Sequence, residues 1–291
     1  IKPVHEPTRW VSQLVVTEKP NKKDLRICID PGPLNKALRR AHYQLPTIDD
    51  VLPELAQAKV FSKLDLSSAF WQIPLDEESS KLTTFASLYG RFSWVRLPFG
   101  LSVSSEIFQR RINMALEGLP GVVVVADDIL VYGQGENKDV ALKDHDKCLR
   151  SLLERCSEQN IKLNKEKSIF RVEELTFLGH LITNVGLKPD PSKVEAVVNM
   201  PAPTNVEEMQ RLVGFVNYLS RFLPSLSQTL EPIRNLGKQD VVWHWEHPQE
   251  EALKKIKTSI TNDPVLTYYD PKEPLKIQCD ASSKGIGSVL L

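Results

Sequence analysis

Residues 122–133 read VVVVADDILVYG, and they place two acidic residues, Asp127 and Asp128, side by side between two apolar runs. The β-branched residues on both sides predict two short strands joined by a tight turn. The simplest explanation of such a pair is two solvated turn residues. The apolar flanks argue against it, because they are expected to be buried and to hold the turn on a rigid scaffold. Like charges on a rigid tip repel each other, and a cation would relieve that repulsion.

A third carboxylate stands at the end of another predicted strand. Residues 59–66, KVFSKLDL, alternate in polarity and predict a strand that ends near Asp65. Hard divalent cations prefer carboxylate oxygens, and two such ions about 3.5–4 Å apart need carboxylates from more than one segment. Asp65 therefore completes a candidate metal site with the acidic pair. The alternative for Asp65 alone is the N-cap of a helix that Ser67 and Ser68 would open.

The composition is that of a globular protein with an ordinary core. Of the 291 residues, 41% are hydrophobic and 25% are charged, and 37 basic residues balance 37 acidic ones. The net charge of zero neither favours nor excludes a nucleic-acid partner, although residues 19–40 are locally basic. No run of 18 apolar residues occurs, so no membrane span is predicted. The four cysteines contain no C-x-x-C pair, which favours a reducing compartment over a disulfide framework.

Three regions with different patterns follow one another along the chain. Residues 1–188 mix predicted strands and helices and are interpreted as an α+β body. Residues 189–262 are predicted to be mainly helical. Residues 263–291 read as a strand, a Ser/Gly-rich turn and the start of a second strand. Because the chain starts at Ile1 and stops in mid-pattern, we expect it to be a piece of a longer polypeptide.

Several local motifs are explained without chemistry. Capping boxes are predicted at Ser192 with Glu195 and at Thr204 with Glu207. Residues 244–247, HWEH, are interpreted as a helix start beside buried tryptophans, since a zinc site needs about four ligands and no Cys or His cluster lies nearby. No G-x-x-x-x-G-K-S/T loop occurs, which disfavours an ATPase, and no Ser/His/Asp arrangement stands out.

Six motifs give the chain a resemblance to a known family. They are LDLSSAFWQIPL, LPFGLSVSSEIFQRRI, VADDILVYG, KLNKEKSIF, LTFLGHLIT and GFVNYLSRFL. Their order and spacing resemble those of reverse transcriptases, in particular the gypsy-type LTR retrotransposon Pol polyproteins, from about Pro7 to Leu291. Six motifs in order are a far more specific signal than a lone Asp-Asp pair.

The resemblance implies a right-hand polymerase followed by the beginning of a ribonuclease H-like α/β domain. The fingers would occupy about 1–42 and 73–102, and the palm about 43–72 and 103–188. The thumb and linker helices would occupy 189–262, and the truncated ribonuclease H-like domain 263–291. Within that last domain, Asp280 would be the first metal carboxylate of a site that we expect to be incomplete.

The implied activity is that of an RNA- and DNA-templated DNA polymerase, which adds dNTPs to a primer 3′ end by two-metal-ion phosphoryl transfer. Asp65, Asp127 and Asp128 would be the catalytic and metal-binding residues, with two Mg²⁺ ions as cofactors and Mn²⁺ as an alternative. The partners would be an RNA or DNA template with its primer, dNTPs and the rest of the Pol polyprotein, and no membrane. A homodimer is left open, and the expected location is the cytoplasm, within virus-like particles.

The resemblance also implies residues that bind the substrates. Arg26 would bind the triphosphate, and Phe70 would be the aromatic gate that excludes a 2′-hydroxyl. The whole nucleotide-binding set comprises Lys22, Lys23, Arg26, Phe70, Phe99 and Gln109. Lys165 and Lys167 would face the nucleic-acid channel or the nucleotide. The primer grip would be FLGH, which comprises Phe177, Leu178, Gly179 and His180.

The chain departs from the family pattern in the acidic motif. Val125 holds the place of the usual tyrosine in Tyr-x-Asp-Asp, and we expect altered template or primer contact rather than lost activity. The alternative function is a catalytically silent, domesticated or decayed nucleic-acid-binding module. The presence of all three carboxylates, of Phe70 and of Arg26 favours the enzyme.

Overall fold

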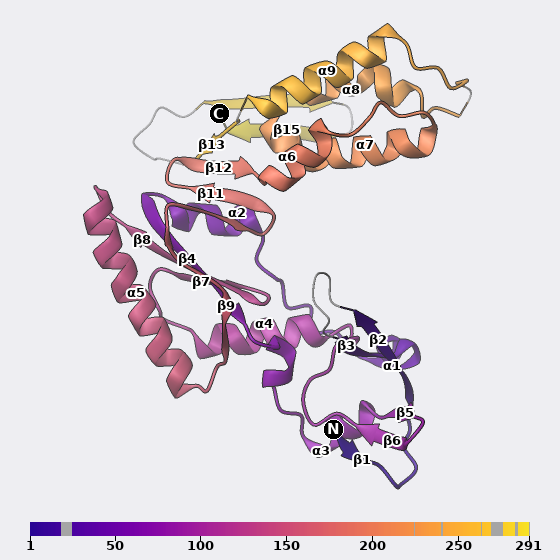
Figure 1. The fold of residues 1–291 in the computed structure, drawn as a ribbon, viewed down its shortest axis with the longest axis vertical. Helices are drawn as coiled ribbons and strands as arrows, with labels where there is room; N and C mark the ends of the chain where they lie inside the picture. The colour runs from indigo at the N-terminus through magenta and orange to yellow at the C-terminus, as the bar shows by residue number, and fades with distance from the viewer. Residues whose placement is uncertain are drawn as a thin grey trace. The chain divides into compact units, whose positions relative to one another are not determined.

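A computed structural model describes residues 1–18, 25–223, 225–239, 241–262, 264–268, 276–282 and 285–290. The chain divides into two compact units (Figure 1). Unit 1 comprises Ile1–Val51 and Ala58–Phe177, and unit 2 comprises Leu52–Gln57 and Leu178–Leu291. Among the described residues, no helix combines the length and apolarity that a membrane crossing requires.

The first sheet of unit 1 carries the acidic pair. Its four antiparallel strands stand in the order β7-β8-β4-β9. They are β7 (Val122–Val125), β8 (Asp128–Gln134), β4 (Ala58–Leu66) and β9 (Leu163–Val172). The predicted strand at 59–66 and the predicted hairpin around the acidic pair are both confirmed. We call β7, β8 and the turn between them the acidic hairpin.

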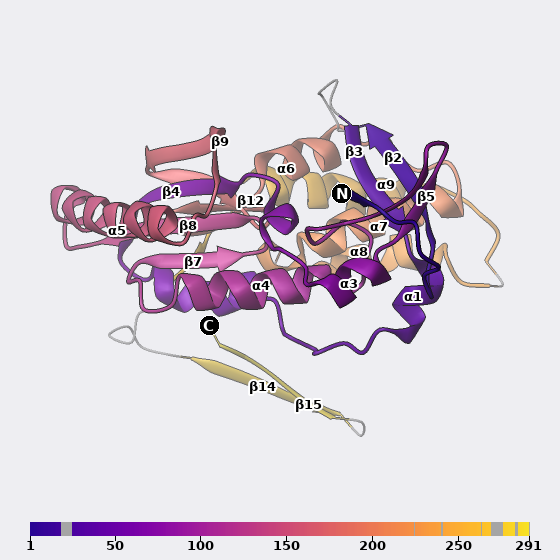
Figure 2. The same ribbon diagram turned by 90° about the horizontal axis from the view of Figure 1, so that it is seen from below.

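One face of this sheet is covered by two helices, α4 (Ser104–Ala115) and α5 (Lys138–Glu158). Figure 2 shows α5 along β8 and β4, and α4 beside β7. Apolar side chains of the strands and helices form one core, in which Leu64, Ile129 and Leu152 are fully buried. The valines that precede the acidic pair and the apolar residues that follow it are almost all buried, so the turn does stand on a rigid scaffold.

The second sheet of unit 1 contains the strands nearest the N-terminus. Its order is β1-β6-β5-β2-β3. The strands are β1 (Lys2–Pro3), β6 (Gly90–Ser93), β5 (Phe85–Ser87), β2 (Ser12–Glu18) and β3 (Leu25–Asp30). Short elements of the same unit are α1 (Gly32–Ala37), α2 (Ile48–Val51), η2 (Ala69–Gln72), α3 (Glu77–Leu82) and β10 (Glu174–Phe177). The sheet packs around Ile29, Phe85 and Trp94.

Unit 2 is mainly helical in its described part, as expected from the pattern after residue 188. Its helices are α6 (Pro191–Val198), α7 (Val206–Tyr218), α8 (Leu226–Asn235) and α9 (His247–Thr261), with 3-10 turns η1 (Leu52–Leu55) and η3 (Ser220–Phe222). Its strands are β11 (His180–Thr183), β12 (Gly186–Pro189), β13 (Leu266–Thr267), β14 (Ile277–Ser282) and β15 (Gly285–Leu290). The last two pair antiparallel, which matches the two strands predicted there, and the predicted turn between them lies outside the described residues.

The predicted capping boxes are wrong by one or two residues. The N-cap of α6 is Asp190, which accepts a hydrogen bond from the Ser192 backbone N–H. The N-cap of α7 is Asn205, which accepts from Glu208. Asp and Asn rank at least as high as Ser and Thr at this position, so the neighbouring residue takes the cap. A capping box does open α9, although Trp243 and Trp245 beside it are half-buried rather than buried.

Candidate active site

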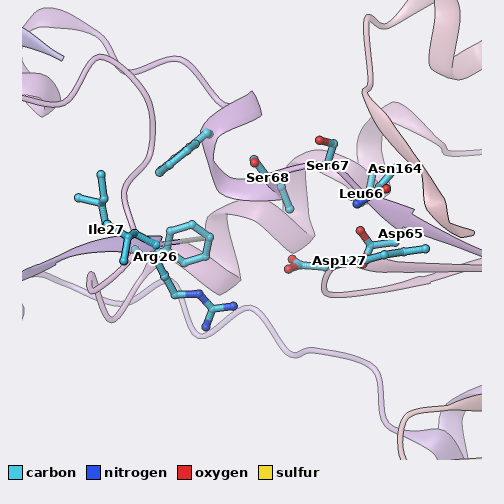
Figure 3. Close-up of a pocket in the computed structure, with 13 residues that line it drawn as sticks. Arg26, Ile27, Asp65, Leu66, Ser67, Ser68, Asp127 and Asn164 are labelled. Carbon is cyan, nitrogen blue, oxygen red and sulfur yellow. The ribbon is translucent and has the colours of Figure 1, made fainter. Parts of the chain in front are cut away.

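A cavity of about 290 Å³ in unit 1 brings the predicted carboxylates together with basic side chains. Figure 3 shows Asp65 and Asp127 on one side and Arg26 on the other, with the Arg26 side chain extending toward Asp127. The described lining residues are Leu25, Arg26, Ile27, Asp65, Leu66, Ser67, Ser68, Ala69, Trp71, Phe99, Asp127, Asn164 and Lys167. Both sheets of unit 1 therefore contribute to this cavity.

Register and backbone hydrogen bonds place the three carboxylates. Asp65 on β4 lies directly opposite Asp128 on β8, so both side chains project from the same face of the sheet. The Leu66 backbone N–H donates to the Asp127 carbonyl at 2.9 Å, which ties the turn to the end of β4. Asp65 is therefore a strand residue and not the helix N-cap that was its alternative explanation, since Ser68 precedes η2.

Gln109 holds the turn from behind. Its side chain is fully buried on α4. Its amide nitrogen donates to the Val124 carbonyl at 2.8 Å, and its amide oxygen accepts from the Ala126 backbone N–H at 2.7 Å. Ala126 has a φ of 51°, a left-handed conformation that costs energy for a residue with a Cβ. The described lining of the cavity does not include Gln109, so the structure places this residue as a support of the acidic turn.

Two lysines neutralise two of the three carboxylates. Lys167 Nζ lies 3.0 Å from Asp65 Oδ2, and Lys63 Nζ lies 3.0 Å from Asp128 Oδ2. Asp127 lies in the turn between them. Burial raises the pKa of Asp127, and the neighbouring charges of Asp65 and Asp128 raise it further, while Lys167 and Arg26 act in the opposite direction. The surroundings of Asp127 therefore destabilise the charged form of its carboxyl group.

The three carboxylates are ligands of the kind that a hard divalent cation prefers, although they are not gathered around one point in this structure. Within the described part of the chain, no three His, Cys, Asp or Glu side chains are close enough together to hold a metal ion. Two of the three carboxylates are instead paired with lysine ammonium groups. Asp65 and Asp127 nevertheless line one cavity, and the raised pKa of Asp127 reflects a negative charge that a cation would stabilise.

Aromatic rings form the opposite side of the cavity. The Phe99 ring lies 4.9 Å from Phe70, and Phe70 lies 5.7 Å from Phe108, measured between centroids. The guanidinium carbon of Arg26 lies 5.6 Å from the Phe99 centroid, within the range of a cation–π interaction. Phe70 packs behind Phe99, whereas Phe99 and Arg26 line the cavity themselves.

The backbone around Phe99 is held tightly against β3. The Ile29 backbone N–H donates to the Phe99 carbonyl at 3.1 Å. Gly100 follows with a φ of 109°, and a Cβ there would lie 2.0 Å from the Ile29 carbonyl oxygen. Only glycine allows the backbone to approach β3 this closely. Phe99 is thereby fixed beside Arg26, which is on the same strand as Ile29.

The residues of the predicted primer grip are divided between the two units. Phe177 ends β10 in unit 1 and is fully buried, whereas Leu178, Gly179 and His180 belong to unit 2. The backbone turns sharply here, since Leu178 and Gly179 both have positive φ. Within unit 2, His180 stacks on Tyr218 at 5.7 Å, and the Tyr218 hydroxyl donates to the Gly179 carbonyl at 2.9 Å.

The remaining predicted residues are separate from this cavity or outside the described structure. Lys22 and Lys23 lie outside the described residues. Asp280 is on β14 in unit 2, where its backbone pairs with Gly287. Sequence reasoning missed Lys63 as the partner of Asp128 and Asn164 as a lining residue. A signal for Lys63 existed, because it stands two residues before Asp65 and therefore on the same face of β4.

A model of the family described as "Reverse transcriptase (RNA-dependent DNA polymerase)" matches residues 17–182, which is more than half of the chain. The chain belongs to the reverse transcriptase family. A second model, described as an RNase H-like domain found in reverse transcriptase, matches residues 245–291. The family and the ribonuclease H-like segment inferred from the motifs are thus confirmed.

Retrotransposon polyproteins are among the relatives of this reverse transcriptase-family chain. The Retrovirus-related Pol polyprotein from transposon 412 of Drosophila melanogaster is 37% identical over 272 residues, which are 93% of this chain and 22% of that protein. The Transposon Tf2-3 polyprotein of Schizosaccharomyces pombe is 32% identical over 268 residues, which are 91% of this chain and 20% of that protein. The chain therefore spans about a fifth of the length of these relatives. The resemblance to gypsy-type Pol polyproteins is confirmed.

Solved structures show the same fold. A foamy viral protease-reverse transcriptase in complex with dsDNA matches with a TM-score of 0.84 and 24% identity, over 99% of this chain and 60% of that one. A foamy viral protease-reverse transcriptase dRH in complex with ds DNA matches with a TM-score of 0.83 and 24% identity, over 96% of this chain and 48% of that one. The right-hand polymerase fold expected from the motifs is therefore confirmed.

Proposed function

We propose that this chain is the polymerase part of a retrotransposon Pol polyprotein, an RNA- and DNA-templated DNA polymerase that adds dNTPs to a primer 3′ end. Family membership sets the reaction class. The observation that carries the proposal is the cavity in which Asp65 and Asp127 face Arg26, with Lys167 beside them. Transfer of a nucleotidyl group from a dNTP requires carboxylates that can bind metal ions, placed opposite groups that can bind phosphate.

We assign the metal-binding role to Asp65, Asp127 and Asp128, with two Mg²⁺ ions as the expected cofactors and Mn²⁺ as an alternative. Divalent ions bound there would supply a lowered pKa for the primer hydroxyl and charge stabilisation for the triphosphate. The protein contributes the rigid placement of the carboxylates, through the register of β4 with β8 and through the Gln109 contacts behind the turn.

The nucleotide would lie between the acidic hairpin and the aromatic side of the cavity. Arg26 presents a planar guanidinium that can donate two hydrogen bonds to phosphate oxygens, and Phe99 orients it. Lys167 would add a second positive charge once the ion pair with Asp65 opens. Phe70 is held between Phe99 and Phe108, and this support suits a gate that excludes a 2′-hydroxyl by steric contact.

The subdomain assignments complete the proposal. Fingers at about 1–42 and 73–102 and palm at about 43–72 and 103–188 would be followed by the thumb at 189–262. Phe177, Leu178, Gly179 and His180 would grip the primer, and Lys22 and Lys23 would bind the nucleotide with Arg26. The proposed partners are primer–template, dNTPs and the rest of the Pol polyprotein, with a second copy of the chain as a further candidate. The proposed location is the cytoplasm, within virus-like particles.

Primer extension on an RNA template with dNTPs and Mg²⁺ tests the function. The wild type is compared with Asp127→Asn and Asp128→Asn, and with Asp139→Asn as an exposed control at the start of α5. We expect primer extension by the wild type and by Asp139→Asn, and none by Asp127→Asn or Asp128→Asn. If the wild type binds primer–template but extends nothing, the chain is the catalytically silent binding module and the polymerase proposal is wrong.

A further inference from the structure

The interface between the first sheet and α5 contains a Ser-His-Asp arrangement whose serine and histidine are buried and whose aspartate is partly exposed. Ser62 on β4 and His145 on α5 are both fully buried. Ser62 Oγ lies 2.8 Å from His145 Nε2, and His145 Nδ1 lies 3.2 Å from Asp146 Oδ1. A nucleophile must be reachable by its substrate, so this buried serine is not one. The arrangement needs another explanation.

The proton positions in this arrangement follow from the partners. The Asp146 carboxylate can only accept, so His145 Nδ1 carries the proton and Nε2 is an acceptor. The Ser62 hydroxyl therefore donates to Nε2, and its oxygen accepts from the Arg171 backbone N–H at 3.0 Å. The Arg171 guanidinium returns to Asp146 with two hydrogen bonds of 2.9 and 2.8 Å. Ser62, His145, Asp146 and Arg171 form a closed ring of hydrogen bonds, which we call the hydrogen-bonded ring. Its Ser62–His145 side is buried, and its Asp146–Arg171 side is exposed.

The hydrogen-bonded ring joins three elements at a point where the pairing of β9 with β4 is irregular. β9 is the edge strand of the sheet, and its register with β4 shifts twice, between Phe61 and Lys63 and between Lys63 and Asp65. Arg171 has a φ of 53°, outside the conformation of a strand. Two irregularities interrupt the ladder of backbone hydrogen bonds that holds this edge strand. The ring supplies side-chain bonds at this place.

The same strand carries two residues into the candidate active site. Asn164 and Lys167 line the cavity, and Lys167 pairs with Asp65 at 3.0 Å. Ser168 Oγ donates to the Asn164 carbonyl at 2.7 Å, which keeps this part of β9 folded upon itself. The position of Lys167 therefore depends on where β9 is anchored to β4. The Lys63–Ile169 pairing contributes to that anchor, and the ring adds side-chain bonds to it four residues after Lys167.

We propose that Ser62, His145, Asp146 and Arg171 are positioning residues, which fix β9 against β4 and so place Lys167 in the active site. This inference rests on the polymerase function proposed above. The ring acts through Lys167 and touches neither the carboxylates nor the nucleotide. Its loss should therefore affect nucleotide use only while Lys167 is present.

The test uses Asp146→Ala in the whole chain, with Lys138→Ala as a matched control. Asp146 is on the exposed edge of α5, where alanine favours the helix, so the variant is expected to fold. Lys138 is on the same helix and forms a similarly exposed ion pair with Glu173, just after β9. Both substitutions thus remove an ion pair between α5 and the β9 region, and only one breaks the ring.

Two measurements are made on each variant. Amide hydrogen exchange of residues 163–168 reports the anchoring of β9 and needs no polymerase activity. The kcat/KM for dNTP is measured for each variant in two backgrounds, one with Lys167 intact and one that also carries Lys167→Ala. We expect faster exchange and a loss of about 3–10-fold with Lys167 present, and no further loss in the Lys167→Ala background. Lys138→Ala should change neither quantity.

Equal losses of kcat/KM in both backgrounds would overturn the inference, since the ring would then be only structural. Unchanged exchange at residues 163–168 would overturn it as well. Arg171→Lys serves as a second variant, because it keeps the charge and the backbone N–H but cannot form the paired hydrogen bonds to Asp146. A smaller loss with the same dependence on Lys167 is expected. A wild type that extends no primer would contradict the polymerase function, whereas the exchange result judges the anchoring separately.

Discussion

The two adjacent aspartates of the acidic turn have different surroundings. Asp128 is paired with Lys63, whereas Asp127 is half-buried between two other carboxylates and has a raised pKa. A carboxyl whose pKa is higher in the folded than in the unfolded protein is bound to a proton more readily when folded, so it lowers stability as the pH rises through that pKa. At neutral pH the site therefore stores an unfavourable charge, which is common where function requires it.

Asp127→Asn should accordingly stabilise the protein at pH 7 while it abolishes primer extension. We expect the thermal unfolding midpoint to rise by about 2–4 °C, which corresponds to roughly 1 kcal/mol for a unit of this size. Differential scanning calorimetry without divalent ions measures the shift, and Asp139→Asn is the exposed control. A midpoint equal to or below that of the wild type would show that Asp127 is not electrostatically strained.

The stacking of Arg26 on Phe99 predicts a selective effect on nucleotide binding. Phe99→Leu keeps an apolar side chain but removes the ring under the guanidinium. A cation–π contact at a partly exposed site contributes about 0.5–1 kcal/mol, so the KM for dNTP should rise about 2–5-fold with little change in kcat. Steady-state extension kinetics measure both constants. Phe99→Tyr retains a ring and should behave like the wild type, and a similar KM rise in both variants would contradict the contact.

At the scale of the elements, the acidic hairpin and β4 were predictable because their signals are local. Two β-branched runs around a short polar turn predict a hairpin, and alternation over 59–66 predicts a strand. The third carboxylate could be chosen for the same reason, since Asp65 stands at a strand end. Helix caps were harder, because Asp190 and Asn205 are as good as the serine and threonine that were chosen.

The hydrogen-bonded ring could not be predicted, because its members come from three segments that are distant in sequence. Ser62 and His145 are 83 residues apart and meet only after α5 packs on β4. Nothing in the local pattern of either residue distinguishes a buried hydrogen-bonded side chain from an exposed one. The register of β9 is equally invisible, since its two irregularities arise from pairing with β4. Lys63 is an intermediate case, which strand alternation and the pairing of Asp65 with Asp128 would have revealed.

The ring also predicts a pH dependence of stability. Burial lowers the pKa of His145, Arg171 lowers it further, and Asp146 and Asp144 act against this. In the unfolded chain the histidine binds a proton below about pH 6.5, whereas in the folded protein it stays neutral to lower pH. Stability should therefore be fully present above pH 6.5 and decline as the pH falls below it.

His145→Gln removes this titration and should flatten the decline. Thermal unfolding midpoints between pH 7.5 and pH 5 are compared for the two proteins, and the wild type should lose more degrees than the variant over this range. The other histidines are common to both proteins, so their contributions cancel in the comparison. Identical slopes would show that His145 is not held in its neutral form.

At the scale of the whole molecule, the chain divides into two units, and the described residues that line the proposed active-site cavity all belong to unit 1. The α+β character of the first 188 residues and the helical character that follows were both read from periodicity. The family came from six motifs in order, and no composition or periodicity argument could have supplied it. The chain spans about a fifth of its retrotransposon relatives, so the activity assigned to it must be measured on this chain itself.

Single-nucleotide addition opposite a defined RNA template base tests the central claim most directly. Each dNTP is offered separately with Mg²⁺ to the wild type and to Asp65→Asn, the carboxylate that comes from the other strand of the site. We expect the wild type to add only the complementary dNTP and Asp65→Asn to add none. Addition that ignores the template base, or that persists in Asp65→Asn, would contradict a templated polymerase built on these carboxylates.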